Sequence, residues 1–207
     1  QLADDRVPWW LLASMVAALV IAFSLDQASG GMRNASIVLC YAACGLLASI
    51  IGVAMARMGK NGGPTRALNR STYITTALFG ILTAAATWIL DFEWRIWGAS
   101  AVGLLVGVVI GLASDYFTND ERRPVRNVAS ASGSGPAFTI LSGVSYGFLS
   151  TLPAMVGIAI SALAAYKLCA PIGEGYAMFG ISMAAVGMLS IVGMIISNDA
   201  YGPIVDN

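Results

Sequence analysis

The chain has 207 residues, of which 57% are hydrophobic and 11% charged, and its mean hydropathy is +0.77. Soluble domains carry about a quarter charged residues, so this composition predicts an integral membrane protein. Eleven basic and eleven acidic residues cancel, which argues against a nucleic-acid partner. With no histidine and three cysteines that form no CxxC pair, zinc and iron–sulfur sites have almost no ligands. A metal would need carboxylate and amide oxygens, which favours hard cations such as magnesium or calcium.

Six segments reach or approach the roughly 20 apolar residues that a spanning helix needs. They cover residues 7–25, 35–58, about 69–90, about 94–117, about 138–168 and about 175–207. Backbone groups facing lipid must all be paired, so we expect an all-α bundle of about six transmembrane helices, without a separate soluble domain. The last two segments exceed a hydrocarbon core of ~30 Å and should project from it. The polar connection 118–138 is too short to fold alone.

The glycines of the fourth segment form a stripe. Gly103, Gly107 and Gly111 recur at every fourth position, a spacing typical of close helix packing in membranes. We interpret them as packing residues.

The basic residues predict the orientation of the bundle, because they favour cytoplasmic loops. One side carries Arg6, Arg57, Lys60, Arg66, Arg70, Arg122, Arg123 and Arg126, and the other carries Arg33, Arg95 and Lys167. We therefore expect both ends of the chain in the cytoplasm, with the lipid bilayer of a prokaryotic inner membrane around the helices. The chain starts without methionine and has no signal peptide, which we interpret as an internal piece or a processed chain.

Two aspartates stand in the closing stretch "NDAYGPIVDN", residues 198–207. Asp199 and Asp206 are seven positions apart, so on a helix they share nearly one face, roughly 10 Å apart along the axis. Pro203 lacks an N–H and would loosen the turn between them. The pattern is consistent with a site for a divalent cation or protons, and Asn207 adds a neutral oxygen. Alternatively, the helix ends at the proline and Asp206 is a solvated loop residue.

Three other features carry weaker signals. Asp115, at the end of the fourth segment, could act directly or pair with a neighbouring arginine, and we favour the ion pair. The glycine–serine stretch 130–138 precedes a helix and could bind an anion, but it contains no complete phosphate-binding motif, so a flexible connection is the better interpretation. Glu174 is expected to be a solvated turn residue.

The closing stretch also carries a resemblance. "DAYGPIVDN" (199–207) closely resembles the "DAYGPISDN" or "DAYGPIADN" segment of the membrane-bound, ion-pumping pyrophosphatases, with only Val205 departing from it. Upstream, "SDYFTNDERRPVRNVASASGSGPAFTILSGVSYGFLSTLPAM" and "YAMFGISMAAVGMLS" are similar to family text in order and spacing. The resemblance covers about residues 36–207, and the first helix matches poorly.

The resemblance implies the middle third of a bundle of about sixteen helices. Family members split magnesium pyrophosphate on the cytoplasmic side and drive H⁺ or Na⁺ outward. By this resemblance Asp206 would be a Mg²⁺ ligand with Asn207 beside it, Asp199 would belong to the same motif, and Asp115 stands where the family has glutamate. K⁺ as an activator and a homodimer are further expectations for the full-length protein.

The chain also departs from the family. The family's "ATN" is "AFT" at 137–139, and the glutamate of "GMES" is Leu149. One aspartate pair cannot hold pyrophosphate, which carries several negative charges, so we expect the isolated chain to be inactive. Two alternatives are a cation-coupled secondary transporter with a broken-helix aspartate site and a degenerate, inactive membrane bundle.

Overall fold

The computed structural model describes residues 9–55, 64–119 and 122–190. These residues form α1 (Trp9–Ser29), α2 (Arg33–Met55), α3 (Pro64–Ile89), α4 (Trp94–Thr118), α5 (Arg123–Ser132), α6 (Pro136–Cys169), a 3₁₀ turn η1 (Ala170–Ile172) and α7 (Tyr176–Leu189). Within these ranges the protein is all-α, as the composition predicts. The membrane segments expected at 35–58, 94–117 and 138–168 correspond to α2, α4 and α6.

The connection 118–138 contains a short helix that the sequence analysis did not predict. It contains the ten-residue helix α5 (Arg123–Ser132), with Pro124 buried in its first turn. Proline suits this position because its fixed φ is helical and its missing N–H would have no partner there. α5 packs along the first part of α6 and contacts the end of α4. A polar stretch therefore becomes helical because a neighbouring helix supports it.

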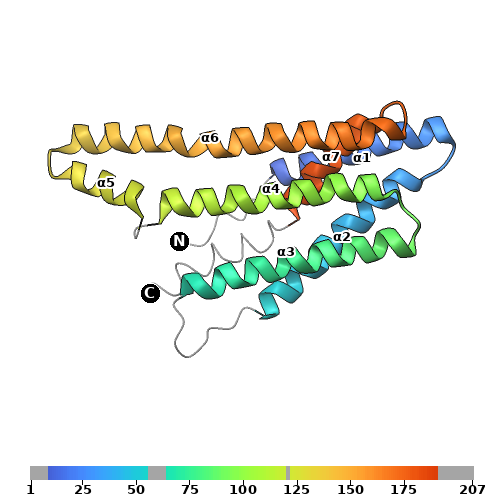
Figure 1. Ribbon diagram of the computed structural model, residues 1–207, viewed down its shortest axis with the longest axis horizontal. Helices are drawn as coiled ribbons and strands as arrows, with labels where there is room; N and C mark the ends of the chain where they lie inside the picture. Colours follow the sequence, from blue (N-terminus) through green and yellow to red (C-terminus); the bar gives the residue numbers. More distant parts are fainter. Residues whose placement is uncertain (1–8, 56–63, 120–121, 191–207) are drawn as a thin grey trace.

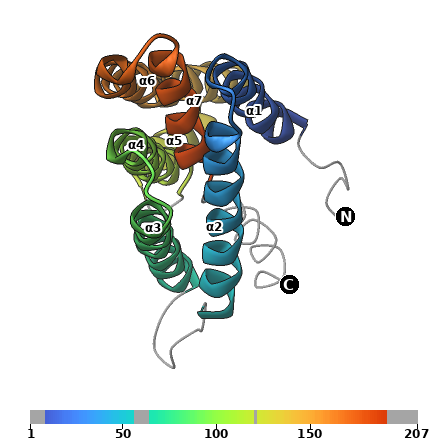
Figure 2. The same cartoon turned by 90° about the vertical axis from the view of Figure 1, so that its right-hand side faces the viewer.

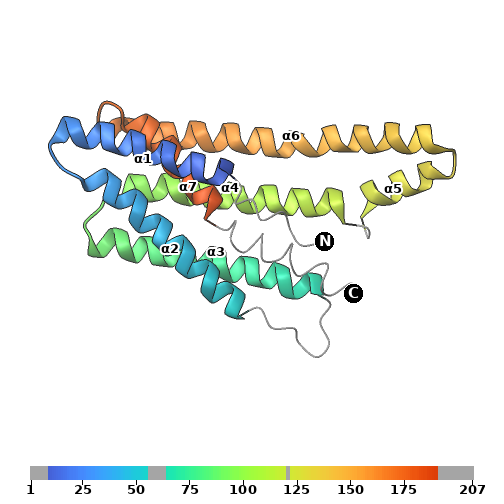
Figure 3. The same ribbon diagram turned by 180° about the vertical axis from the view of Figure 1, so that it is seen from behind.

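The helices lie side by side along one long axis (Figures 1 and 3). The turns between α1 and α2, between α3 and α4, and between α6 and α7 all lie at one end, and α5 lies at the other. We call them the turn end and the α5 end. Viewed along the bundle, α7 is central (Figure 2), and it contacts α1, α2, α4 and α6.

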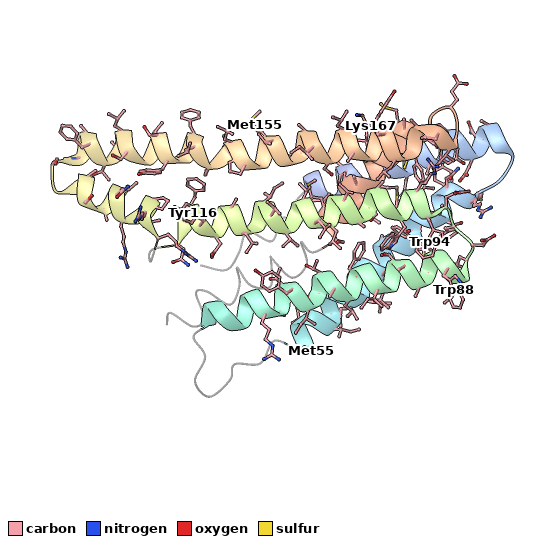
Figure 4. All side chains as sticks on the ribbon, viewed as in Figure 1. Met55, Trp88, Trp94, Tyr116, Met155 and Lys167 are labelled. Carbon is pink, nitrogen blue, oxygen red and sulfur yellow. The ribbon has the colours of Figure 1, made fainter. Side chains whose placement is uncertain are left out.

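Four stretches of the described residues are long and apolar enough to cross a membrane. They are Arg33–Met55, Arg70–Ile89, Trp94–Ser132 and Pro136–Ile172. Two shorter apolar helices cover Ala13–Ala28 and Tyr176–Leu189. Exposed Trp88 and Trp94 lie at the turn end and exposed Tyr116 toward the other end of α4 (Figure 4), as expected for rings at the two membrane interfaces.

Glycines bring α4 and α7 together, as the stripe in the sequence predicts. A Cβ at Gly103 would overlap the carbonyl oxygen of Ala184, and one at Gly107 would lie 3.1 Å from the carbonyl oxygen of Met188. From the other side, a Cβ at Gly187 would overlap the carbonyl oxygen of Ser100. Close backbone approach of this kind is how membrane helices associate without a hydrophobic driving force.

Hydroxyl groups line the contact between α2 and α3. The buried residues Ser71, Thr75, Thr83 and Thr87 follow one face of α3 at multiples of four positions. Ser71 Oγ donates to the Gly52 carbonyl of α2 at 2.7 Å, and Tyr41 of α2 shares a 2.6 Å hydrogen bond with Thr87 Oγ1. Each threonine also donates to a carbonyl one turn earlier in α3. These bonds satisfy groups that would be costly to leave unpaired in an apolar environment.

Candidate functional site

The strongest candidates, Asp199, Asp206 and Asn207, lie outside the described residues. The helix expected at 175–207 is described from Tyr176 to Leu189. α7 runs in the same direction as α4, because residue pairs 81 positions apart meet at both Gly103 with Ala184 and Gly107 with Met188. Both helices therefore run from the turn end toward the α5 end.

Asp115 lies in the last turn of α4, half-buried, and its backbone carbonyl accepts the N–H of Asn119 at 2.9 Å. The preferred ion pair is not formed, because no salt bridge joins Asp115 to Arg122, Arg123 or Arg126 in the part of the chain that the structure describes. All three arginines are exposed around the start of α5.

The glycine–serine stretch is a tight turn rather than an anion cradle. The N–H groups of Gly133, Ser134 and Gly135 donate to carbonyls of α5 at 3.3, 3.0 and 3.1 Å. Ser130 Oγ donates to the Asn127 carbonyl at 2.9 Å. Because these donors are already engaged within the turn, they are not aimed at a phosphate. This agrees with the interpretation as a connection.

α5 is tied to α6 by a polar contact. Asn127 Nδ2 donates to Tyr146 OH at 2.6 Å. The Asn127 side chain is exposed and the Tyr146 side chain is partly buried.

Two residues of α6 that depart from the family text are exposed. Phe138, within "AFT", lies in the first turn of α6, and Leu149 lies three turns further on. Glu174 is exposed in the turn before α7, as expected.

The described ranges hold no group of three or more cysteine, aspartate and glutamate side chains that could bind a metal. They therefore do not form a complete metal site on their own. At the α5 end they contribute one described carboxylate, Asp115, and three arginines.

Sequence reasoning missed Asp26. This aspartate, in the last turns of α1, is 2% exposed and accepts hydrogen bonds from the first turn of α2. Nearby, the Arg33 guanidinium donates to the Asp91 carbonyl in the α3–α4 turn. The sequence did offer one signal, because an aspartate near the end of an apolar helix is unusual. It could not identify the hydrogen-bond partners of Asp26, because these are brought together only by the fold.

Comparison with known proteins identifies the family to which the chain belongs. A sequence model of the family described as inorganic H⁺ pyrophosphatase matches residues 11–207. The chain belongs to this family. The match begins at residue 11 and so includes most of α1, further toward the start of the chain than the resemblance we described over about residues 36–207. The ion-pumping pyrophosphatase resemblance is confirmed.

The relatives that match this chain are named for different pumped ions. A putative K(+)-stimulated pyrophosphate-energized sodium pump of Bacteroides thetaiotaomicron is 36% identical over 202 residues, which are 92% of this chain and 27% of that protein. A K(+)-insensitive pyrophosphate-energized proton pump 2 of Moorella thermoacetica is 35% identical over 94% of this chain and 29% of that protein. A K(+)-insensitive pyrophosphate-energized proton pump of Methanosarcina mazei is 34% identical over 100% of this chain and 30% of that protein. The chain thus spans less than a third of each relative.

Proposed function

We propose that these residues are part of a longer pump that couples hydrolysis of magnesium pyrophosphate to transport of H⁺ or Na⁺ across a membrane. The observation that carries the proposal is the motif at 199–207, which lies inside the region matched by the family. The isolated 207-residue chain is proposed to be inactive, because pyrophosphate needs more cations and basic groups than one aspartate pair can organise.

In this proposal Asp206 is a Mg²⁺ ligand, Asn207 is a neutral oxygen beside it, and Asp199 belongs to the same site or is coupled to it. Bound Mg²⁺ would neutralise phosphate charge and assist the attacking water. The donor set fits this ion, because carboxylate and amide oxygens are the ligands that it prefers. Asp115 adds a carboxylate at the end of α4, toward which α7 also runs.

The proposal places the α5 end in the cytoplasm of a prokaryotic cell and the helices in its inner membrane. Arg122, Arg123 and Arg126 are exposed at that end, as the preference of basic residues for cytoplasmic loops requires. The pumped ion is H⁺ or Na⁺, since relatives named for each are similarly close to this chain. K⁺ activation and a homodimer are proposed for the full-length protein.

The test uses the full-length parent protein, purified and reconstituted into liposomes. We expect Asp206→Ala to lower fluoride-sensitive phosphate release from magnesium pyrophosphate at least about 100-fold, because a ligand of the bridging metal is lost. The matched control is Asp91→Asn, which changes an aspartate in the α3–α4 turn, at the end of the bundle opposite α5. Near-normal turnover in Asp206→Ala would refute the metal-ligand assignment. Ion transport without any phosphate release would instead indicate a secondary transporter.

A further inference from the structure

Three helices meet around a buried carboxylate at the turn end. We define the Asp26 junction as Asp26 of α1, Asn34 and Ala35 of α2, and Gly175 and Tyr176 at the start of α7. Asp26 is 2% exposed and Asn34 4% exposed. Asp26 Oδ1 accepts the Asn34 N–H and the Asn34 side-chain amide, both at 2.9 Å. Asp26 Oδ2 accepts the Ala35 N–H, also at 2.9 Å.

The carboxylate caps a helix to which it does not belong. α2 begins at Arg33, so the N–H groups of Asn34 and Ala35 have no acceptor within α2. A negative charge at this position is also favoured by the dipole of α2. The three donors named above are all N–H groups, which suits an ionised carboxylate. A buried charge is tolerable only with such partners, so the junction favours one arrangement of α1 and α2.

Asn34 extends the junction to α7. Its side-chain amide donates to Tyr176 OH at 3.3 Å, in addition to its bond with Asp26. Gly175 precedes α7 with a φ of +82°, a conformation that favours glycine, and a Cβ there would lie 2.7 Å from Leu25 Cδ2. The first turn of α7 is therefore packed against α1 and linked to α2 by one amide.

We propose that Asn34, oriented by Asp26, is a positioning residue that fixes the start of α7, the helix that precedes the aspartate motif in the sequence. The role in catalysis rests on the proposed function. Over the 14 residues of α7, about 21 Å, the helix is a stiff element, so a shift at Tyr176 is carried to Leu189. The close contacts of Gly103 and Gly187 with backbone across the α4–α7 interface leave α7 little room to adjust along its length.

Two variants separate positioning from capping. Asn34→Ala removes the bridge to Tyr176 and the side-chain donor to Asp26 Oδ1, but it keeps the two backbone N–H groups that Asp26 caps. Tyr176→Phe removes only the hydroxyl, and Tyr166→Phe on α6, a half-exposed tyrosine, is its matched control. Asp26→Ala removes both functions and is expected to lower the thermal midpoint by at least about 4 °C. The first two variants should keep the midpoint of the full-length protein within about 2 °C.

The first measurement does not depend on activity. A Cβ at Gly45 of α2 would lie 3.5 Å from Ser190 Cβ after α7, which is within the range for a disulfide. In a full-length protein with Cys40, Cys44 and Cys169 replaced by alanine, Gly45→Cys with Ser190→Cys should cross-link readily. We expect Asn34→Ala and Tyr176→Phe to slow cross-linking at least about 3-fold, whereas Tyr166→Phe leaves its rate unchanged.

The second measurement is the Mg²⁺ concentration that gives half-maximal pyrophosphate hydrolysis. We expect it to rise at least about 3-fold in Asn34→Ala and Tyr176→Phe, with a smaller change in maximal rate. Unchanged cross-linking would overturn the proposal, and so would slowed cross-linking with unchanged Mg²⁺ dependence. If the wild-type parent releases no phosphate, the proposed function and the catalytic role of Asn34 both fail, while cross-linking still decides whether the junction positions α7.

Discussion

The contact between α4 and α7 and the contact between α2 and α3 join membrane helices by different means. α4 and α7 meet through glycines that face backbone carbonyls, as Gly103 faces Ala184. α2 and α3 meet across hydroxyl groups, most of which also bond to their own helix, as Thr75 does to the Ser71 carbonyl at 3.0 Å. A backbone carbonyl cannot turn away from a new atom without moving its helix, whereas a serine or threonine side chain can change its χ1 rotamer. α7, the helix that precedes the aspartate motif in the sequence, is therefore held by the contact that tolerates added atoms less well.

The largest expected effect is on the α4–α7 contact. Gly103→Ala places a Cβ on the Ala184 carbonyl and should destabilise the full-length protein by about 3 kcal/mol, because both helices must move apart. Thermal unfolding in detergent measures the loss. Gly111→Ala is the control from the same stripe, since a Cβ there meets no described atom within 4 Å. Equal stability of the two variants would contradict the backbone contact.

A smaller effect is expected at the α2–α3 contact. A Cβ at Gly52 would overlap Thr75 Oγ1, which can move only if Thr75 changes its χ1 rotamer and gives up its bond to the Ser71 carbonyl, so Gly52→Ala should cost about 2 kcal/mol. Adding Thr75→Ala should recover most of this loss, because the obstructing atom is gone. A double-mutant cycle measures the coupling. Additive losses would show that Gly52 and Thr75 do not meet.

The smallest effect is expected for a single hydrogen bond across α2 and α3. Tyr41→Phe removes the bond to Thr87, whose hydroxyl still donates to the Thr83 carbonyl at 2.7 Å. We expect a loss of about 0.6 kcal/mol, the average for such bonds between membrane helices. Thermal unfolding, with exposed Tyr73→Phe as the reference, is the measurement. A loss as large as that of Gly103→Ala would erase the difference between the two contacts.

Much of the bundle could be predicted from hydropathy, because a membrane leaves few choices to an apolar segment. The helix expected at 94–117 is observed at Trp94–Thr118, and the one expected at 138–168 at Pro136–Cys169. α3 begins at Pro64, whereas hydropathy predicted a start near residue 69. The prediction was late because Arg66, Asn69 and Arg70 lower the mean hydropathy of the first turns. α5 was missed because its serines and arginines are typical of loops and its stability comes from packing on α6.

The aspartate site stays a prediction, and it rests on the sequence in a different way. Spacing alone left Asp199 and Asp206 open to two interpretations, and the nine-residue motif linked them to a family that the comparisons then showed. Asp26 could not be found by either route. Its carboxylate accepts hydrogen bonds from the first turn of α2. The periodicity of apolar residues within a helix does not predict a contact between the end of one helix and the start of the next.

α6 also affects how these residues can be studied. Large apolar side chains of α6 are exposed, such as Phe148 at 75% and Met155 at 70%. Met155 projects away from the bundle (Figure 4), and the described helices cover only one side of this 34-residue helix. Exposed apolar surface of this extent causes aggregation in water. If the 207 residues are expressed separately, α6 is where association into insoluble material should start. Nanodiscs would prevent it by covering this surface with lipid.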